Sequence, residues 1–152
     1  MIRKATNNDI TSILKLYREQ LKEMAELIPD FIKAGDQSAE FIEKTITNND
    51  SDILIYEDNN IVVGFILLQA KQRPDFSFIV SGKHCYIMDL IITENHRSKG
   101  FGTALMNSAM DWAKEQDCNI VSLDVLSNNP RAITLYEKLG FIPKAQEMFC
   151  KL

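Results

Sequence analysis

The chain has 152 residues, of which 45% are hydrophobic and 25% charged, and its formal net charge is −4. This length and composition predict one globular domain that spans residues 1–152 and buries a substantial core. The negative charge argues against a general nucleic-acid binder, which needs a basic face for the phosphate backbone, but it still allows a local basic pocket.

Three features bear on the compartment in which the protein works. The first residues, Met-Ile-Arg-Lys-Ala-Thr-Asn, have no apolar run after their positive charges, so no signal peptide is expected. The longest near-continuous apolar stretch, Ile61 to Leu68, is much too short to cross a bilayer. The three cysteines are far apart, lack metal-ligand spacing and suit a reducing compartment. We therefore expect a cytoplasmic protein that acts without a membrane.

The first half of the chain predicts a strand, two helices and a hairpin. Small polar residues, Thr6 to Asn8 and Ser38, are typical helix N-caps, and apolar residues follow each of them at helical spacing. A polar turn at residues 57–60 separates two apolar runs, which is the pattern of a hairpin. The expected elements are a strand (Ile2 to Ala5), a helix (about Asp9 to Leu27), a helix (Ala39 to about Thr47) and the hairpin strands Asp52 to Tyr56 and Ile61 to Ala70.

The second half predicts three strands and two helices. A strand, a helix and another strand within about forty residues should form a right-handed crossover between parallel neighbours. The rest of the sheet is expected to be antiparallel, so the fold class is mixed α/β (α+β). The expected elements are a strand (Cys85 to Ile92), a helix to about Gln116, a strand (Ile120 to Leu126), a helix from Pro130 that Gly140 ends, and a final strand (Phe141 to Leu152).

A glycine-containing loop, Arg97-Ser-Lys-Gly-Phe-Gly102, connects the Cys85 to Ile92 strand to the following helix. The first N–H groups of a helix are unpaired and carry the positive end of the helix dipole. Gly100 and Gly102 remove side chains from the approach, while Arg97 and Lys99 add positive charge. Such a loop suits a phosphate or pyrophosphate.

Two common phosphate-binding patterns do not fit this loop. A P-loop places Lys before Ser or Thr, but Thr103 directly follows Gly102. A dinucleotide fingerprint needs a third glycine where Leu105 stands. The pattern Arg/Gln-x-x-Gly-x-Gly/Ala after a strand is matched in full. The loop therefore resembles the pyrophosphate-binding motif of the GNAT superfamily of N-acetyltransferases, which use acetyl-coenzyme A (acetyl-CoA).

A second stretch strengthens the resemblance. Residues Leu123 to Phe141, LDVLSNNPRAITLYEKLGF, look like another GNAT signature, with a strand, Asn129, Ala132 three residues later, Leu-Tyr and then Gly-Phe. The opening IRKATNNDI is also similar to the usual start of the family. The resemblance spans essentially the whole chain, with its motifs in the family's order.

The resemblance implies a role for each matching residue. The strand before the loop would pair with the pantetheine arm, and an N–H near Ile92 would stabilise the oxyanion of the tetrahedral intermediate. Asn129 would contact the cofactor arm, and Tyr136 would protonate the departing thiolate. The base in this family is often a carboxylate, here either Asp89 or, slightly less favoured, Asp124, and some members need no base. The implied cofactor-binding residues are Leu90, Ile91, Ile92, Arg97, Ser98, Lys99, Gly100, Phe101, Gly102, Thr103 and Asn129.

The implied activity is transfer of an acetyl group from acetyl-CoA to a primary amine by direct attack in a ternary complex, without a metal. A small-molecule acceptor is preferred, and a protein N-terminal or lysine acetyltransferase and a non-catalytic acyl-CoA-binding module remain alternatives. In the family, the first two helices and the connection at residues 71–83 would choose the acceptor. Many members are dimers, so a homodimer is compatible with the resemblance.

Several of these residues also have a purely structural explanation. Asn129 before Pro130 is an ordinary helix start. Tyr136 lies on an apolar helix face, where tyrosine often only packs. Asp89 and Asp124, each taken alone, could accept hydrogen bonds from the backbone or face water.

Overall fold

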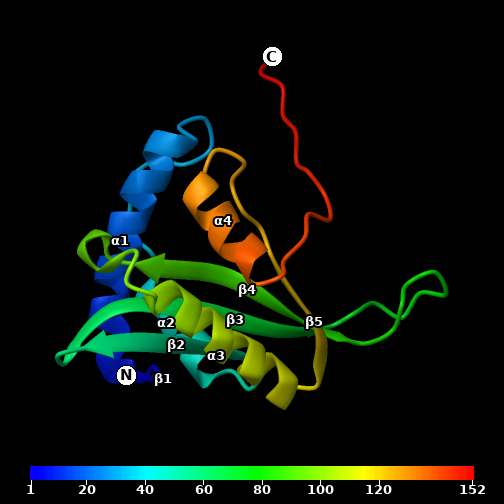
Figure 1. Cartoon of the computed structure of the whole chain (residues 1–152), viewed down its shortest axis with the longest axis horizontal. Helices are drawn as coiled ribbons and strands as arrows, with labels where there is room; N and C mark the ends of the chain where they lie inside the picture. Colours follow the sequence, from blue (N-terminus) through cyan, green and yellow to red (C-terminus); the bar gives the residue numbers. More distant parts are fainter.

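The computed structural model describes residues 1–152 and contains one five-stranded sheet with helices on both faces (Figure 1). The sheet order follows the chain, and every neighbouring pair is antiparallel except β4 and β5, which run parallel. This confirms the mixed α/β class and the parallel crossover. The strands are β1 (Ile2–Lys4), β2 (Ser51–Asp58), β3 (Ile61–Gln72), β4 (Lys83–Ile92) and β5 (Cys118–Leu123).

The helices divide the core into two layers. Helices α1 (Ile10–Leu27) and α2 (Ala39–Thr47) pack on one face of the sheet, and α3 (Phe101–Glu115) and α4 (Pro130–Lys138) pack on the other. Short 3-10 turns, η1 (Asn7–Asp9) and η2 (Glu94–His96), precede α1 and the glycine loop. β3 lies in the middle of the sheet and is apolar on both faces, as a strand covered on both sides should be.

The helix and turn boundaries follow from local chemistry. The Ser38 hydroxyl accepts a hydrogen bond from the Phe41 N–H at 3.3 Å, and the Asn129 side chain accepts one from the Ala132 N–H at 3.3 Å. Both are N-cap bonds at the predicted helix starts. The β2–β3 turn has φ of 48° at Asn59 and 63° at Asn60, a conformation that asparagine tolerates.

A β-bulge in β4 changes the face on which its later side chains lie. Leu68 on β3 is opposite Ile87, but Leu67 is opposite Asp89, so Met88 is an extra residue on β4. Without the bulge, alternation would place Asp89 on the α3 face with Ile87. With it, Asp89 shares the α1 face with Leu67.

Two predictions for the second half of the chain were wrong. β5 ends at Leu123 rather than at Leu126, so Asp124 lies just beyond the strand. Residues Phe141 to Leu152 form no strand. The last eleven residues, 142–152, which we term the C-terminal tail, extend away from the sheet and make no hydrogen bond to other backbone groups (Figure 1, red). Strand propensity alone cannot produce a strand, because a strand also needs a neighbour.

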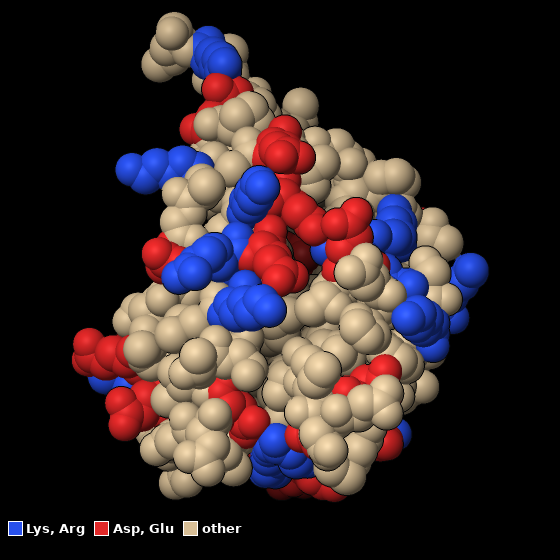
Figure 2. Space-filling view, turned by 90° about the vertical axis from the view of Figure 1, so that its left-hand side faces the viewer, with Lys and Arg blue, Asp and Glu red and all other residues tan.

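The charged side chains are interspersed on the surface. Figure 2 shows acidic side chains gathered in the upper middle of one face, with basic side chains in separate groups on either side of them. The helices do not combine the length and apolar composition needed to span a membrane.

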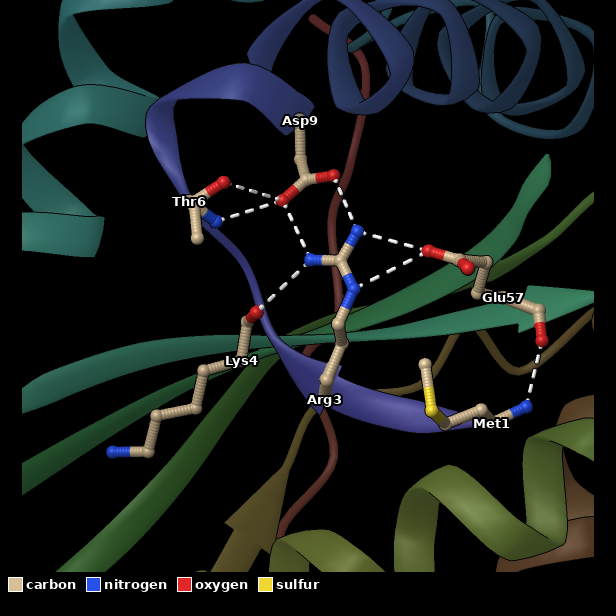
Figure 3. Close-up of polar contacts among 6 residues, drawn as sticks. All are labelled: Met1, Arg3, Lys4, Thr6, Asp9 and Glu57. Carbon is tan, nitrogen blue, oxygen red and sulfur yellow. Dashed lines mark hydrogen bonds and ion pairs between the residues drawn. The ribbon is translucent and has the colours of Figure 1, made fainter. Parts of the chain in front are cut away.

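An ion-pair network joins the start of the chain to its neighbours (Figure 3). The Arg3 guanidinium on β1 donates to both oxygens of Asp9 at 2.8 and 2.9 Å and to Glu57 Oε2 at 2.9 Å. Thr6 donates to Asp9 through its N–H at 2.8 Å and its hydroxyl at 3.0 Å. The Arg3 hydrogen bond is the main cause that lowers the pKa of Asp9 to about 2. The network fixes the point where β1 turns into α1.

Candidate functional site

A cleft opens where β4 and β5 separate. The two strands pair only as far as Ile87 and Leu123, and β4 continues alone to Ile92. The gap holds a cleft of about 790 Å³. Its walls come from α1, the second half of β4, the glycine loop with the start of α3, the β5–α4 connection and α4.

The second half of β4 presents free backbone groups to this cleft. The Thr93 N–H donates to the Val63 carbonyl on β3 at 2.9 Å. Because peptide groups alternate in direction along an antiparallel strand, those of Leu90 and Ile92 point away from β3, towards the cleft. Of these groups, the Ile92 carbonyl accepts a hydrogen bond from the Arg97 guanidinium at 2.9 Å, and the others are free. The peptide groups of Ile91 point towards β3. The expected pairing with an extended ligand therefore fits Leu90 and Ile92 better than Ile91.

The glycine loop lies at one end of the cleft and has unpaired backbone N–H groups. The first helical hydrogen bond of α3 runs from Ala104 N–H to Gly100 C=O at 3.0 Å, so the N–H groups of Phe101, Gly102 and Thr103 have no helical partner. Gly100 has a φ of 84°, and a Cβ built on it would meet nothing within 4 Å. Ser98, Gly100, Gly102 and Thr103 line the cleft. This is the geometry that suits a phosphate group.

Three residues of the loop are placed differently from the expectation. The Arg97 guanidinium lies at the cleft but donates to Glu23 Oε1 at 2.6 Å and to the Ile92 carbonyl at 2.9 Å, so it ties the loop to α1 and β4. Lys99 is exposed and outside the cleft. The Phe101 ring stacks on Tyr56, with centroids 4.1 Å apart.

Asp89 lies in the wall of the cleft and has a raised pKa. Burial of the carboxyl group raises its pKa from 3.8 to about 6, although hydrogen bonds from Tyr17 and Gln20 act in the opposite direction. The Tyr17 hydroxyl donates to Asp89 Oδ2 at 2.6 Å. A carboxylate with a pKa near 6 is suited to accept a proton at neutral pH.

Asp124 has a more open environment. It is exposed at the end of β5, where its Oδ2 accepts a hydrogen bond from the Tyr86 hydroxyl at 2.7 Å. Both aspartates line the cleft. Of the two, the geometry favours Asp89 as a base, because its surroundings tune its proton affinity.

The last helix contributes Tyr136 and Asn129. Tyr136 is partly buried in the cleft wall, and burial, followed by the negative charge of Asp89, raises the pKa of its phenol. Its proton is therefore held at neutral pH, as a proton donor requires. Asn129 lines the cleft while its side-chain oxygen caps α4, so the cap and a ligand contact are compatible.

The resemblance placed α1 among the segments that choose the acceptor, but it did not predict the hydrogen bond between Tyr17 and Asp89 or a role for the glycine of β3. Gln20 and Glu23 line the cleft, and Tyr17 reaches its wall through the hydrogen bond to Asp89. The hydroxyl of a buried tyrosine needs a partner, which is a signal that the sequence does contain. Gly64 lies opposite Ile92, and a Cβ there would approach the Ile91 carbonyl oxygen to 2.7 Å.

The connection at residues 71–83 does not contribute to the cleft. It joins the end of β3 to the start of β4, whereas the cleft opens at the other end of β4. Figure 1 shows it projecting beyond the sheet. Of the two acceptor-choosing segments expected, only the one containing α1 lines the cleft.

Comparisons with known proteins identify the family. The sequence model of the acetyltransferase (GNAT) family matches residues 11–141. The chain is 34% identical over 145 residues to the uncharacterized N-acetyltransferase YhfO of Bacillus subtilis, covering 92% of this chain and 88% of that protein. This chain belongs to the GNAT family. It is also 23% identical over 146 residues to the L-amino acid N-acyltransferase MnaT of Escherichia coli, covering 95% of this chain and 81% of that protein.

The GNAT fold is shared along the whole chain. The crystal structure of a mutant protein from Bacillus halodurans, 22% identical, superposes with a TM-score of 0.95 and covers 100% of this chain and 99% of that one. The superposition includes the C-terminal tail. In this GNAT chain the two sequence motifs, far apart along the polypeptide, line the same cleft.

Proposed function

We propose that this chain is an acetyl-CoA-dependent N-acetyltransferase that acetylates the primary amine of a small molecule. One observation carries the proposal: the free edge of β4 leads along a single cleft into the unpaired N–H groups at the start of α3. An extended amide-containing arm that ends in a pyrophosphate, as in CoA, matches both parts of this surface. The cleft volume of about 790 Å³ is within the range of small-molecule sites.

The arm of the cofactor would add to β4 in the manner of a short strand. The peptide groups of Leu90 supply its hydrogen bonds, and the N–H groups of Phe101 to Thr103 hold the pyrophosphate. Gly100 and Gly102 keep side chains away from the phosphates. The Ile92 N–H, which has no strand partner on the cleft side, would donate to the developing oxyanion.

The residues around Asp89 would perform the proton transfers. An alkylamine has a pKa of about 10.4 and is mostly protonated at neutral pH, so it must lose a proton before it attacks. Asp89 accepts that proton, directly or through water. The nitrogen then forms the new C–N bond, the C–S bond breaks, and the Tyr136 hydroxyl gives its proton to the departing sulfur. The nitrogen loses its second proton as it becomes an amide, and this proton restores the Tyr136 phenol through water.

Two features support a small cationic acceptor. Asp89 and Asp124 place two carboxylates in the same cleft wall, which attracts a cation. The relative MnaT is named as an enzyme that acts on L-amino acids, which also present a primary amine.

Calorimetry with acetyl-CoA tests whether the cleft binds this cofactor. We expect binding by the unmodified chain and a loss of affinity of at least about tenfold in Gly102→Val, because the new side chain fills the approach to the N–H groups. Asn107→Val, an exposed change on the same helix outside the cleft, is the control and should bind normally. Equal affinity of Gly102→Val and Asn107→Val would contradict the site.

Turnover separates an enzyme from a binding module. A panel of amino acids, polyamines, aminoglycosides and short peptides is incubated with acetyl-CoA, and release of the CoA thiol is measured. We expect at least one small amine to accelerate thiol release. Binding of acetyl-CoA without acceleration by any amine would instead indicate a non-catalytic module.

A further inference from the structure

The side chain of Tyr86 on β4 connects the acidic wall of the cleft to the surface beside it. Its hydroxyl donates to Asp124 Oδ2 at 2.7 Å, and Asp124 lines the cleft. The ammonium group of Lys71 on β3 lies over the Tyr86 ring, 5.5 Å from its centroid. A carboxylate and a cation therefore contact the same tyrosine, the carboxylate at its hydroxyl and the cation over its ring.

The surface next to Tyr86 carries further positive charge. His84 lies two residues before Tyr86, on the same side of β4, and is opposite Lys71. Burial lowers the pKa of His84, and the positive charges of Arg73, Lys71 and Lys144 lower it further. The Nδ1 atom of His84 is buried and has no hydrogen-bond partner. We term Lys71, Arg73 and Lys144 the basic cluster; they come from β3, the connection after it and the C-terminal tail.

The basic cluster has no counter-ion in the chain. Arg73 donates to two neutral groups, the Val80 carbonyl at 3.0 Å and the side-chain oxygen of Asn119. Lys71 and Lys144 are exposed and form no ion pair with a carboxylate. Three cations from separate segments thus create a local positive potential beside an acidic cleft wall.

We propose that the acceptor is a zwitterion whose amine lies at Asp89 and Asp124 and whose carboxylate binds at the basic cluster, beyond Tyr86. The inference rests on the proposed acetyl transfer in the cleft and narrows its substrate class. Charges of opposite sign on either side of Tyr86 fix the direction in which such a molecule binds. A diamine would instead bring its second cation against Lys71, and like charges repel.

A series of straight-chain ω-amino acids tests the preference without any need for turnover. The acids increase in length from β-alanine, and calorimetry measures the binding of each to the chain saturated with CoA. We expect affinity to rise to an optimum at one chain length, where the carboxylate reaches the basic cluster. At that length the acid should bind at least about fivefold more tightly than the alkylamine of equal length, which lacks the carboxylate.

Reversal of one charge in the basic cluster should reverse the preference. In Lys71→Glu, the dissociation constant of the best acid should rise at least about tenfold, and that of the diamine of equal length should fall. Lys15→Glu is the control: it changes the net charge equally, at an exposed position of α1 outside the cleft. It should leave both dissociation constants within about twofold. A folding defect would weaken both ligands together, so opposite changes identify the effect of charge.

Two results would overturn this inference. One is that the ω-amino acids bind no more tightly than alkylamines of equal length at every length. The other is that Lys71→Glu and Lys15→Glu have the same effect, which would place the carboxylate elsewhere.

Failure of the proposed function gives a different result. Acids that bind the CoA-saturated chain but never accept an acetyl group from acetyl-CoA would support the recognition of charge and contradict the enzyme. Equal acetylation of acids, alkylamines and diamines would support the enzyme and contradict the zwitterion.

Discussion

Asp89 shows how its surroundings give a single side chain an unusual pKa. It belongs to an otherwise largely apolar strand, and the bulge at Met88 directs it to the face of α1, where it meets the Tyr17 hydroxyl. Burial raises its pKa to about 6, and the Tyr17 hydrogen bond limits that rise. The balance of these two effects sets the pH at which the carboxylate becomes available.

Replacing Tyr17 with Phe should shift the pH dependence of turnover. Removal of a hydrogen bond that lowers the pKa of Asp89 lets this pKa rise further, so the acid limb of kcat/KM should move to higher pH by about one unit. Tyr86→Phe, which removes the equivalent bond to Asp124, is the control and should leave the limb in place. A shift in Tyr86→Phe alone would assign the base role to Asp124.

Asp89→Asn should make the protein more stable while it removes activity. The pKa of Asp89 is higher in the folded chain than its ordinary value of 3.8, so the folded state binds this proton more tightly, and its stability falls as the pH rises from about 4 to about 6. The difference corresponds to about 3 kcal/mol above that range. Asparagine carries no charge and can still accept from Tyr17.

Urea denaturation at several pH values measures this effect. The gain from Asp89→Asn should be largest at about pH 8 and disappear below about pH 4, where the unmodified carboxyl is protonated in both states. Asp124→Asn, at an exposed position, should change the free energy of unfolding by less than about 0.5 kcal/mol. A loss of stability in Asp89→Asn at alkaline pH would show that the charge is not buried as the structure indicates.

At the scale of elements, the Arg3 network (Figure 3) connects β1, η1 and β2. Arg3→Met leaves Asp9, which is only 6% exposed, without its cationic partner. We expect the free energy of unfolding to fall by about 2–3 kcal/mol at neutral pH. Because the pKa of Asp9 is lowered to about 2, its contribution is present above about pH 4 and is lost as the pH falls through about 2.

Arg18→Met provides the matched comparison for this network. Arg18 also pairs with an aspartate, Asp36, but the two side chains are 70% and 66% exposed. Water screens such a pair, so its loss should lower the free energy of unfolding by less than about 1 kcal/mol. Chemical denaturation of both variants measures the difference, and equal losses would show that burial of Asp9 does not matter.

The elements differ in how well the sequence predicts them. The helix starts at Ser38 and Asn129 depend on side-chain caps within a few residues, and the β2–β3 turn depends on adjacent asparagines, so local sequence is enough. The end of β5 and the absence of a final strand depend on whether a neighbouring strand is present. No local pattern carries that information, because the partner is distant in the sequence.

For the molecule as a whole, the sequence predicted the motifs of the candidate site but not the contacts that bring distant residues together there. The glycine loop and the Asn129 to Tyr136 stretch could be identified from the sequence, because each motif is defined by the spacing of a few nearby residues. The pairing of Arg97 with Glu23 and of Asp89 with Tyr17 joins residues more than seventy positions apart. Such contacts depend on the packing of α1 against the sheet, which requires the folded structure.

The extra residue at Met88 has a consequence for comparing relatives. The side chains of β4 alternate between the two faces of the sheet, and the extra residue shifts this alternation by one position. The face of a residue after Met88 therefore follows from its distance to the glycine loop, and the face of a residue before Met88 follows from its distance to the start of the strand. In a homologue that lacks the extra residue, the same sequence would place its side chains on the opposite face of the sheet. The neighbouring side chain would then face a bound molecule. In a relative, the residue equivalent to Asp89 is therefore found by counting back from Gly100, and an alignment that places a gap inside this strand will assign the wrong residue.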